Sequence, residues 1–247
     1  MIPFVRREKI MDELENKKIM YIEDLLVILD GVSESTIRRD LKMLEDQNYI
    51  TLLHGGAVKL KLDSYEIPVG AKKLLYKEDK EKIAKFAASL VEDEEVIYID
   101  SGTTCSAMVK YIKATGVRVI TSNIQVLNEM NGKNIASCII VGGEVNRNLD
   151  SIVGPLTDET LRNLHFDKAF LGISGFGIDI GFNTPDFREA SKKSIVNPNS
   201  QKCFVLADSS KFNKSTLVKA FGIHESTLIT NKVIPQLDGV IEYLVAD

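Results

Sequence analysis

The sequence lacks several features that mark specialised classes of protein. It has no tryptophan, three cysteines and three histidines among its 247 residues. Cys105, Cys138 and Cys203 are separated by 33 and 65 residues, and neither spacing is that of a metal-binding or redox motif. We therefore expect three small buried side chains at these positions, and neither a metal site nor a bound cofactor.

Long hydrophobic runs are also absent. The apolar segments, such as residues 96–99 and 138–141, are much shorter than the roughly 18 residues that a membrane span requires. Residues 1–18 carry charges every few positions and have no apolar core of a signal peptide. These patterns predict a soluble cytoplasmic protein with no membrane partner, and a hydrophobic content of 44% excludes a disordered or fibrous chain.

A general excess of positive charge is missing too. The formal net charge is −4, and residues 1–61 contain 10 Lys and Arg against 11 Asp and Glu. Bulk charge therefore gives no indication of a nucleic-acid partner, so such a function would depend on where individual basic side chains lie.

The N-terminal part of the chain nevertheless shows the spacing of a helix–turn–helix. Residues 6–30 contain two stretches with apolar side chains at helical intervals, and a short break follows. A third helix is expected in residues 33–47, where Ser33 is a natural N-cap. Residues 49–60 then predict a hairpin of two strands around a Gly-Gly turn. The buried face of the third helix would carry Ile37, Leu41 and Leu44.

The outward face of that third helix has the chemistry of a DNA reader. A helix fits the major groove, hydroxyls near its N-terminus can bond phosphates, and arginines can bond phosphates or guanine edges. The hairpin would then be the wing. The alternative is a three-helix bundle with a solvated charged face. The candidate DNA contacts are Ser33, Ser35, Thr36, Arg38, Arg39, Lys42 and His54.

Two further segments follow. Residues 60–76 lack a clear pattern and contain Pro68 and Gly70, so we expect a linker between a DNA-binding domain at 1–59 and a larger domain at 77–247. In the larger domain, apolar β segments alternate with helical stretches. This alternation predicts an α/β fold with a mostly parallel sheet and right-handed crossovers.

Five apolar runs of the larger domain end in small or polar residues: IDSGTT, VITSN, IIVGGE, AFLGISG and FVLADSSK. Carboxyl ends of parallel strands meet at one edge, where open α/β sheets bind ligands, so we expect a polar site there. Residues 99–104 offer backbone N–H groups at a helix start, which favours a phosphate, and Lys211 is a second candidate contact. The alternative is a set of ordinary turns, with Thr103 as an N-cap and Lys211 in solvent.

Taken together, these motifs resemble a known family. VSESTIRRDLKMLE followed by HGGA is similar to the N-terminal signature of the DeoR-type bacterial repressors. IDSGTT, TSN, VGGE, DKAFLGISG and LADSSKF occur in the order typical of the sensor domain of that family. The resemblance spans nearly the whole chain. It implies a winged helix–turn–helix regulator that binds double-stranded operator DNA, responds to a phosphorylated sugar and forms a homo-oligomer, a dimer or a tetramer.

The larger domain also resembles ribose-5-phosphate isomerases, which implies a shared fold. Where those enzymes have an acidic GADE motif, this chain has GISG at 172–175. The best match to their glutamate base is Lys193, whereas DSSK at 208–211 is retained. Such an isomerisation needs a carboxylate base, and a lysine is mostly protonated. The resemblance therefore implies a sensor without catalytic residues.

The sequence thus predicts a transcriptional regulator that acts as a repressor of a sugar-metabolism operon. Two alternatives are a sugar-phosphate isomerase-like enzyme and an oligomeric DNA-binding protein without a ligand. The residues expected to bind the effector are Asp100, Ser101, Gly102, Thr103, Thr104, Thr121, Ser122, Asn123, Gly142, Gly143, Lys193, Asp208 and Lys211.

Overall fold

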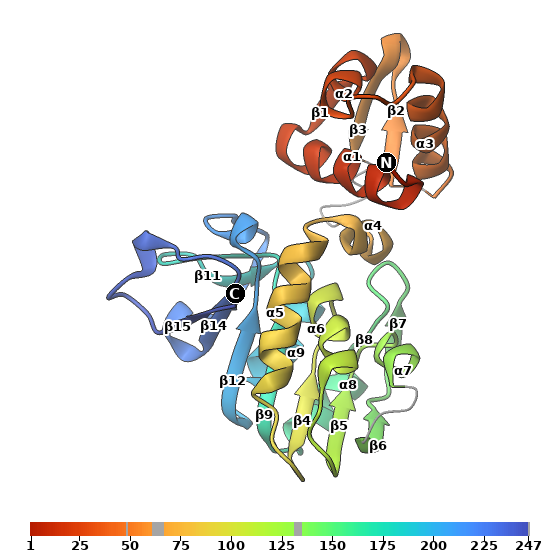
Figure 1. Cartoon of the computed structure of the whole chain (residues 1–247). Coiled ribbons are helices and arrows are strands. Elements are labelled where there is room, and N and C mark those ends of the chain that lie inside the picture. The colour runs from red at the N-terminus through yellow and green to blue at the C-terminus, as the bar shows by residue number, and fades with distance from the viewer. Residues whose placement is uncertain (48, 61–66, 131–134, 247) are drawn as a thin grey trace. The chain divides into compact units, whose positions relative to one another are not determined.

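The computed structural model describes residues 1–47, 49–60, 67–130 and 135–246 (Figure 1). The chain divides into two compact units, Met1–Lys77 and Glu78–Asp247. Within the described residues, no helix is both long enough and apolar enough to span a membrane.

The first unit combines helices with a small antiparallel sheet. The helices are α1 (Pro3–Lys17), α2 (Ile22–Ile28), α3 (Glu34–Asp46) and α4 (Val69–Leu74). The strands are β1 (Ile19–Tyr21), β2 (Ile50–Leu52) and β3 (Ala57–Leu60), in the order β1-β3-β2. The helices and the β2–β3 hairpin confirm the predicted winged helix–turn–helix, whereas β1 was not predicted because three residues are too few to show an alternating pattern.

Local signals in the sequence account for the ends of α3 and for the hairpin turn. The Ser33 hydroxyl accepts a hydrogen bond from the Thr36 backbone N–H at 3.4 Å, as an N-cap does. Between β2 and β3, Gly55 and Gly56 have φ values of 79° and 77°, which glycine adopts at little cost and which suit a tight hairpin. The predicted apolar face of α3 is fully buried in the core of the unit.

The second half of the predicted linker is instead part of the first unit. Leu60 ends β3, residues 61–66 lie outside the described residues, and α4 follows at once. Ala71 and Leu75 are buried in the same core as the apolar face of α3. The helix was not predicted because it has only six residues and contains Gly70. Pro68 is its N-cap, where the missing N–H of proline costs nothing.

The second unit contains a seven-stranded sheet in the order β15-β14-β12-β9-β4-β5-β6. All of its strand pairs are parallel, which confirms the predicted α/β fold. The strands are β4 (Val96–Ile99), β5 (Val117–Thr121), β6 (Ile135–Ile140), β9 (Phe166–Gly172), β12 (Ser200–Leu206), β14 (Thr227–Thr230) and β15 (Tyr243–Val245).

Helices and short antiparallel strands complete this unit. The helices are α5 (Lys77–Ser89), α6 (Thr103–Met108), α7 (Val126–Glu129), α8 (Pro155–Arg162) and α9 (Phe187–Val196). The short strands are β7 (Glu144–Asn146), β8 (Ser151–Val153), β10 (Gly175–Gly177), β11 (Gly181–Thr184) and β13 (Val218–Phe221).

Alternating side chains of the central strands pack into two separate cores. Ile97 and Ile99 of β4 join α5 and α6 on one face of the sheet, and Tyr98 joins α8 and α9 on the other. Figure 1 shows α5 running along the first of these faces. A strand that is buried on both sides reads as a continuous apolar run, which is why the sequence indicated parallel strands.

The strand order places β4 at the point where the chain changes direction across the sheet. The chain adds β5 and β6 on one side of β4, then returns to add β9, β12, β14 and β15 on the other side. Crevices beyond the carboxyl ends of the strands at such a point are where doubly wound sheets bind ligands. The loops after β4, β5 and β9 lie at this point of the sheet.

One buried ion pair ties α3 to the rest of the first unit. Asp40, on the inward side of α3, contacts the guanidinium of Arg6 on α1, and both side chains are buried. By contrast, Arg38 contacts Glu34 at 2.7 Å on the exposed side of the same helix.

We expect Asp40→Ala to lower the free energy of unfolding by about 3–5 kcal/mol, because it leaves the Arg6 charge buried without a counter-charge. Arg38→Ala, which removes the exposed pair, should cost less than about 1 kcal/mol. Urea denaturation of the full chain, followed by circular dichroism, measures both. Equal losses in the two variants would contradict the structural role of Asp40.

Candidate functional site

The exposed face of α3 brings together most of the predicted DNA contacts. Ser33, Ser35 and the basic residues of α3 are exposed, as is His54 in the hairpin, and Thr36 is half-buried. The Ser33 hydroxyl lies 3.1 Å from that of Ser35 and 2.9 Å from that of Thr36. The face therefore has a cluster of hydroxyls at the N-terminus of α3, followed by cationic side chains.

The basic side chains of α3 differ in whether they have an acidic partner, and this difference was not predicted from the sequence. Arg38 is paired with Glu34, and the Lys42 Nζ lies 3.0 Å from Glu45 Oε2 and 3.2 Å from Asp46 Oδ1. For Arg39 the described part of the chain provides no hydrogen bond or ion pair. Arg39 is thus the guanidinium of α3 that can bind an external group without first leaving an acidic neighbour.

At the carboxyl edge of β4, four charged side chains form a buried cluster. Lys193 Nζ lies 2.9 Å from Asp100 Oδ2 and 2.8 Å from Glu189 Oε2, and Lys192 Nζ lies 3.1 Å from Glu189 Oε1. Each of these side chains is at most 3% exposed. With two carboxylates and two ammonium groups, the cluster is balanced in charge, as burial demands.

Hydroxyl groups from the loop after β4 and from two further segments complete this cluster. Ser101 Oγ and Ser151 Oγ each donate a hydrogen bond of 2.6 Å to Glu189. Lys192 Nζ donates to Ser122 Oγ at 2.9 Å and to Ser151 Oγ at 2.7 Å. The cluster therefore joins α9 to the ends of β4 and β5 and to β8.

The charges in this cluster hold one another ionised. Burial alone would raise the pKa of Glu189, but the ammonium groups of Lys192 and Lys193 lower it well below its usual value. Burial alone would lower the pKa of Lys193, but Asp100 and Glu189 raise it above the usual lysine value. A carboxylate with a strongly lowered pKa is a weak base, so Glu189 is poorly suited to remove a proton from a sugar carbon.

Glu189 and Lys192 were not among the predicted site residues. The chain does bring carboxylates to this edge, although GISG replaces the acidic motif of the isomerases. Glu189 lies three and four residues before Lys192 and Lys193, the spacing of an ordinary ion pair on an exposed helix face. Only the packing of α9 shows that this face is buried.

Several other predicted effector residues are buried, and some of them form hydrogen bonds within the protein. Thr121 Oγ1 donates to the Ile99 carbonyl at 2.6 Å, and Asn123 Nδ2 donates to the Asp100 carbonyl at 3.0 Å. These buried contacts brace the end of β5 against the end of β4. Thr104, in the first turn of α6, is also buried.

The two glycine-containing loops differ in the space above them. A Cβ on Gly102 would meet no atom within 4 Å, and the neighbouring Thr103 is partly exposed. A Cβ on Gly143 would lie 2.0 Å from Thr157 Oγ1, and the Gly142 carbonyl accepts a hydrogen bond from that hydroxyl at 2.8 Å. Close packing on α8 thus accounts for Gly143, whereas a Cβ on Gly142 would make only an ordinary contact of 3.6 Å with Leu156. The loop after β4 is open.

Asp208 and Lys211 lie at the end of β12, next to the end of β9. Lys211 Nζ donates to the Ile173 carbonyl at 2.8 Å, and the preceding Gly172 N–H donates to Asp100 Oδ2 at 3.1 Å. Residues 172 and 173 therefore connect the two parts of the predicted site. Burial alone would raise the pKa of Asp208. The nearby charges of Lys211 and Lys80 outweigh this effect and lower the pKa below the usual aspartate value.

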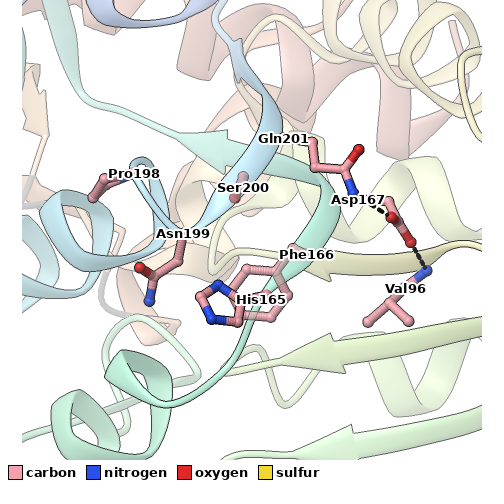
Figure 2. A pocket seen from close by; sticks show the side chains of 8 residues that line it. All are labelled: Val96, His165, Phe166, Asp167, Pro198, Asn199, Ser200 and Gln201. Carbon is pink, nitrogen blue, oxygen red and sulfur yellow. Dashed lines mark hydrogen bonds between the residues drawn. The ribbon is translucent and has the colours of Figure 1, made fainter.

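A cavity of about 410 Å³ opens at the opposite, amino end of the same strands (Figure 2). Asp167 in its wall already accepts hydrogen bonds from the Val96 N–H at 2.8 Å and from Gln201 Nε2 at 2.9 Å (Figure 2). None of the predicted effector residues lines this cavity. The described residues contain no group of His, Cys, Asp and Glu suited to hold a metal ion.

We expect Glu189→Gln to lower the free energy of unfolding by about 3–5 kcal/mol at neutral pH, because it leaves two buried ammonium groups with one carboxylate. Since the pKa of Glu189 is lowered on folding, its stabilising effect is present at neutral pH. The effect is lost as the pH falls below the ordinary glutamate pKa of about 4.3 and through the lower folded value.

Denaturation of both proteins between pH 7 and pH 2 tests this expectation, and the difference between them should shrink on the acid side. Glu144→Gln is the matched control, because Glu144 pairs with Arg188 on the surface. A difference that does not depend on pH would contradict the assignment of the charge to Glu189.

Comparisons with known proteins agree with the two-unit organisation. The family described as "DeoR-like helix-turn-helix domain" matches residues 6–62, and that described as "DeoR C terminal sensor domain" matches residues 76–232. The HTH-type transcriptional regulator FruR of Bacillus subtilis strain 168 is 36% identical over 226 residues, which cover 91% of this chain and 89% of FruR.

A second relative and a solved structure are similar over smaller parts of the chain. The glycerol-3-phosphate regulon repressor of Escherichia coli K12 is 33% identical over 189 residues, 76% of this chain and 75% of that protein. Ribose 5-phosphate isomerase A of Methanocaldococcus jannaschii aligns with 55% of this chain and 54% of its own, at 21% identity and a TM-score of 0.40. The matched family consists of regulators rather than enzymes, and this chain belongs to the DeoR family of helix–turn–helix transcriptional regulators.

Proposed function

We propose that this regulator is a cytoplasmic repressor of a sugar-metabolism operon and that a phosphorylated sugar bound to the second unit controls it. Relatives named as the glycerol-3-phosphate regulon repressor and a putative aga operon transcriptional repressor support the class of operon. The proposal for the ligand depends on one observation. The charges of the buried cluster balance one another, whereas the neighbouring loop after β4 is open.

The proposed position of the phosphate lies beside the buried cluster rather than within it. Lys192 and Lys193 are neutralised by Glu189 and Asp100, so neither has charge to spare for a phosphate. A phosphate would instead bind over Gly102 and Thr103, where the first N–H groups of α6 are not used by the helix's own hydrogen bonds. Lys211, at the end of β12, is the proposed cation for the same ligand.

Control of DNA binding by this ligand requires two states with different affinity for the sugar phosphate. We propose a homo-oligomer, a dimer or a tetramer, as the DNA-binding form. The charge of the first unit supports this part of the proposal. A single copy of this unit has no excess of positive charge, so counterion release adds little to its affinity for DNA. Several copies of the first unit bound to one operator would each add specific contacts, and the affinity of the oligomer would rise.

We expect Arg39→Ala to weaken operator binding by about 1–3 kcal/mol if its guanidinium binds a guanine edge. Arg38→Ala should weaken binding less, because Arg38 must first leave Glu34. Gel-shift titrations at one fixed salt concentration, on DNA selected with the wild-type protein, measure both. Lys17→Ala is the control of equal charge on another helix, and unchanged affinity in both arginine variants would remove them from the interface.

We expect Thr103→Ala and Lys211→Ala each to weaken binding of a hexulose phosphate while leaving operator binding intact. A ligand at 100 times its dissociation constant should stabilise the wild-type protein by about 2.7 kcal/mol. Thermal-shift measurements with fructose and tagatose phosphates, and with the corresponding free sugars, provide the test. Lys211→Arg, which keeps the charge, should lose less than Lys211→Ala.

Equal binding of a free sugar and its phosphate would overturn the phosphate part of this proposal. A complete lack of stabilisation by any sugar phosphate would favour a DNA-binding protein without a ligand. Aldose–ketose interconversion of a bound sugar phosphate would favour the isomerase alternative, which needs an available carboxylate base.

A further inference from the structure

The cavity at the amino end of the sheet has no role in the proposed function, yet its wall has a definite chemistry. Its volume of about 410 Å³ lies in the range of roughly 300–1,000 Å³ that is typical of small-molecule sites. The apolar part of the wall consists of Val96, Phe166 and Pro198. The polar part consists of His165, Asp167, Asn199, Ser200 and Gln201 (Figure 2). The hydrogen bonds that these polar groups already form decide which ligands the cavity suits.

The polar side chains at the start of β12 direct their hydrogens into the protein. The Ser200 hydroxyl donates to the Val196 carbonyl at 2.7 Å, and Gln201 Nε2 donates to Asp167 Oδ1 at 2.9 Å. Asn199 Nδ2 donates to two backbone carbonyls at the end of α8. These bonds orient the side chains and leave the oxygen atoms of Asn199, Ser200 and Gln201 as acceptors for a ligand.

Asp167 adds a negative charge to this wall. Its carboxylate accepts one hydrogen bond on each oxygen, from the Val96 N–H and from Gln201 (Figure 2). A carboxylate has about four lone-pair sites, so each oxygen can accept a further donor. Within the described residues Asp167 forms no ion pair, because the nearby Lys168 and Arg162 pair with glutamates instead. The charge of Asp167 is therefore available to a ligand.

The ends of two helices make the potential at the cavity still more negative. Asn199 comes directly after the end of α9, and its amide nitrogen lies 3.0 Å from the Leu161 carbonyl and 3.3 Å from the Arg162 carbonyl of α8. The C-terminal end of a helix carries a partial negative charge and favours cations. Residues 92–95, which lead into Val96, are all acidic as well.

We infer that this cavity is a second ligand site of the chain and that its ligand is a small organic cation with a guanidinium or primary ammonium group. Such a group has N–H donors and no acceptor, so it matches the charge of Asp167 and the oxygen atoms beside it. A phosphate or carboxylate would face that charge and those oxygens. The apolar part of the wall would contact the carbon chain of the ligand. The inference does not depend on the proposed function, because none of the proposed effector residues lines this cavity.

Matched ligands test the inference on the unmodified full chain. Agmatine carries both cationic groups, whereas butylguanidinium and butylurea have nearly the same shape and only the first is a cation. In thermal-shift measurements at constant ionic strength, agmatine and butylguanidinium at millimolar concentration should raise the Tm, because they bind the folded state. Butylurea should not. Equal shifts with butylguanidinium and butylurea, or no shift with either cation, would overturn the inference.

Gln201→Lys is the sharpest variant, because its ammonium group would replace the amide as donor to Asp167 and would occupy the place of the ligand. Gln201 is exposed, so the fold should tolerate the change. Calorimetry should show at least about tenfold weaker binding of agmatine, the loss of one hydrogen bond to a charged group. Asp167→Asn, which removes the charge, should lose as much. Asn128→Lys, at an exposed position of α7, is the control for the added charge and should bind agmatine as the wild-type protein does. Unchanged affinity in both cavity variants would overturn the inference.

The three histidines of the chain allow the bound cation to be located. His165 lines the cavity, His54 lies in the hairpin of the first unit, and His224 lies in the short turn at residues 223–225. Agmatine should shift the NMR signals of the His165 ring and leave those of the other two rings unchanged. The shift should be absent in Gln201→Lys. Signals that move at His54 or His224 but not at His165 would place the cation elsewhere and overturn the inference.

Discussion

The buried cluster of Asp100, Glu189, Lys192 and Lys193 is the interaction on which the carboxyl edge of the sheet depends. Its side chains come from the loop after β4 and from α9, and hydroxyls after β5 and at the start of β8 bind to them. Removing any one charge would leave the others in a medium that solvates them poorly. The cluster thus fixes the loops on which a ligand would lie, without itself providing charge for that ligand.

The same cluster separates this protein physically from an enzyme with similar strand-end motifs. Proton transfer requires a carboxylate whose pKa lies near the working pH and whose lone pairs are available. Glu189 has neither property, because two lysines lower its pKa and two serine hydroxyls bind its oxygens. The cluster therefore gives Glu189 no means of transferring a proton, which agrees with membership of a family of regulators.

The sequence predicted the features that arise from repeating patterns and missed those that arise from packing between distant segments. Ile37, Leu41 and Leu44 recur at helical spacing, and the strand segments are continuous apolar runs, so the recognition helix and the parallel sheet were predictable. The acidic partners of Arg38 and Lys42 lie within four residues in the sequence, but that spacing alone does not establish an ion pair. The burial of Glu189 depends on contacts with Ser101 and Ser151, which are far away in the sequence, and no local pattern shows that.

The pairing of cations on α3 has a consequence for how the protein searches DNA. Glu34, Glu45 and Asp46 neutralise two of the three basic side chains on that helix. In the proposed complex, in which α3 contacts the DNA, few condensed ions would be displaced by each DNA-binding unit. The logarithm of affinity should then fall only gently with the logarithm of salt concentration. Weak adhesion to random sequence shortens each nonspecific encounter. In the proposed complex, discrimination between the operator and the rest of the genome would depend on base contacts more than on attraction to the phosphate backbone.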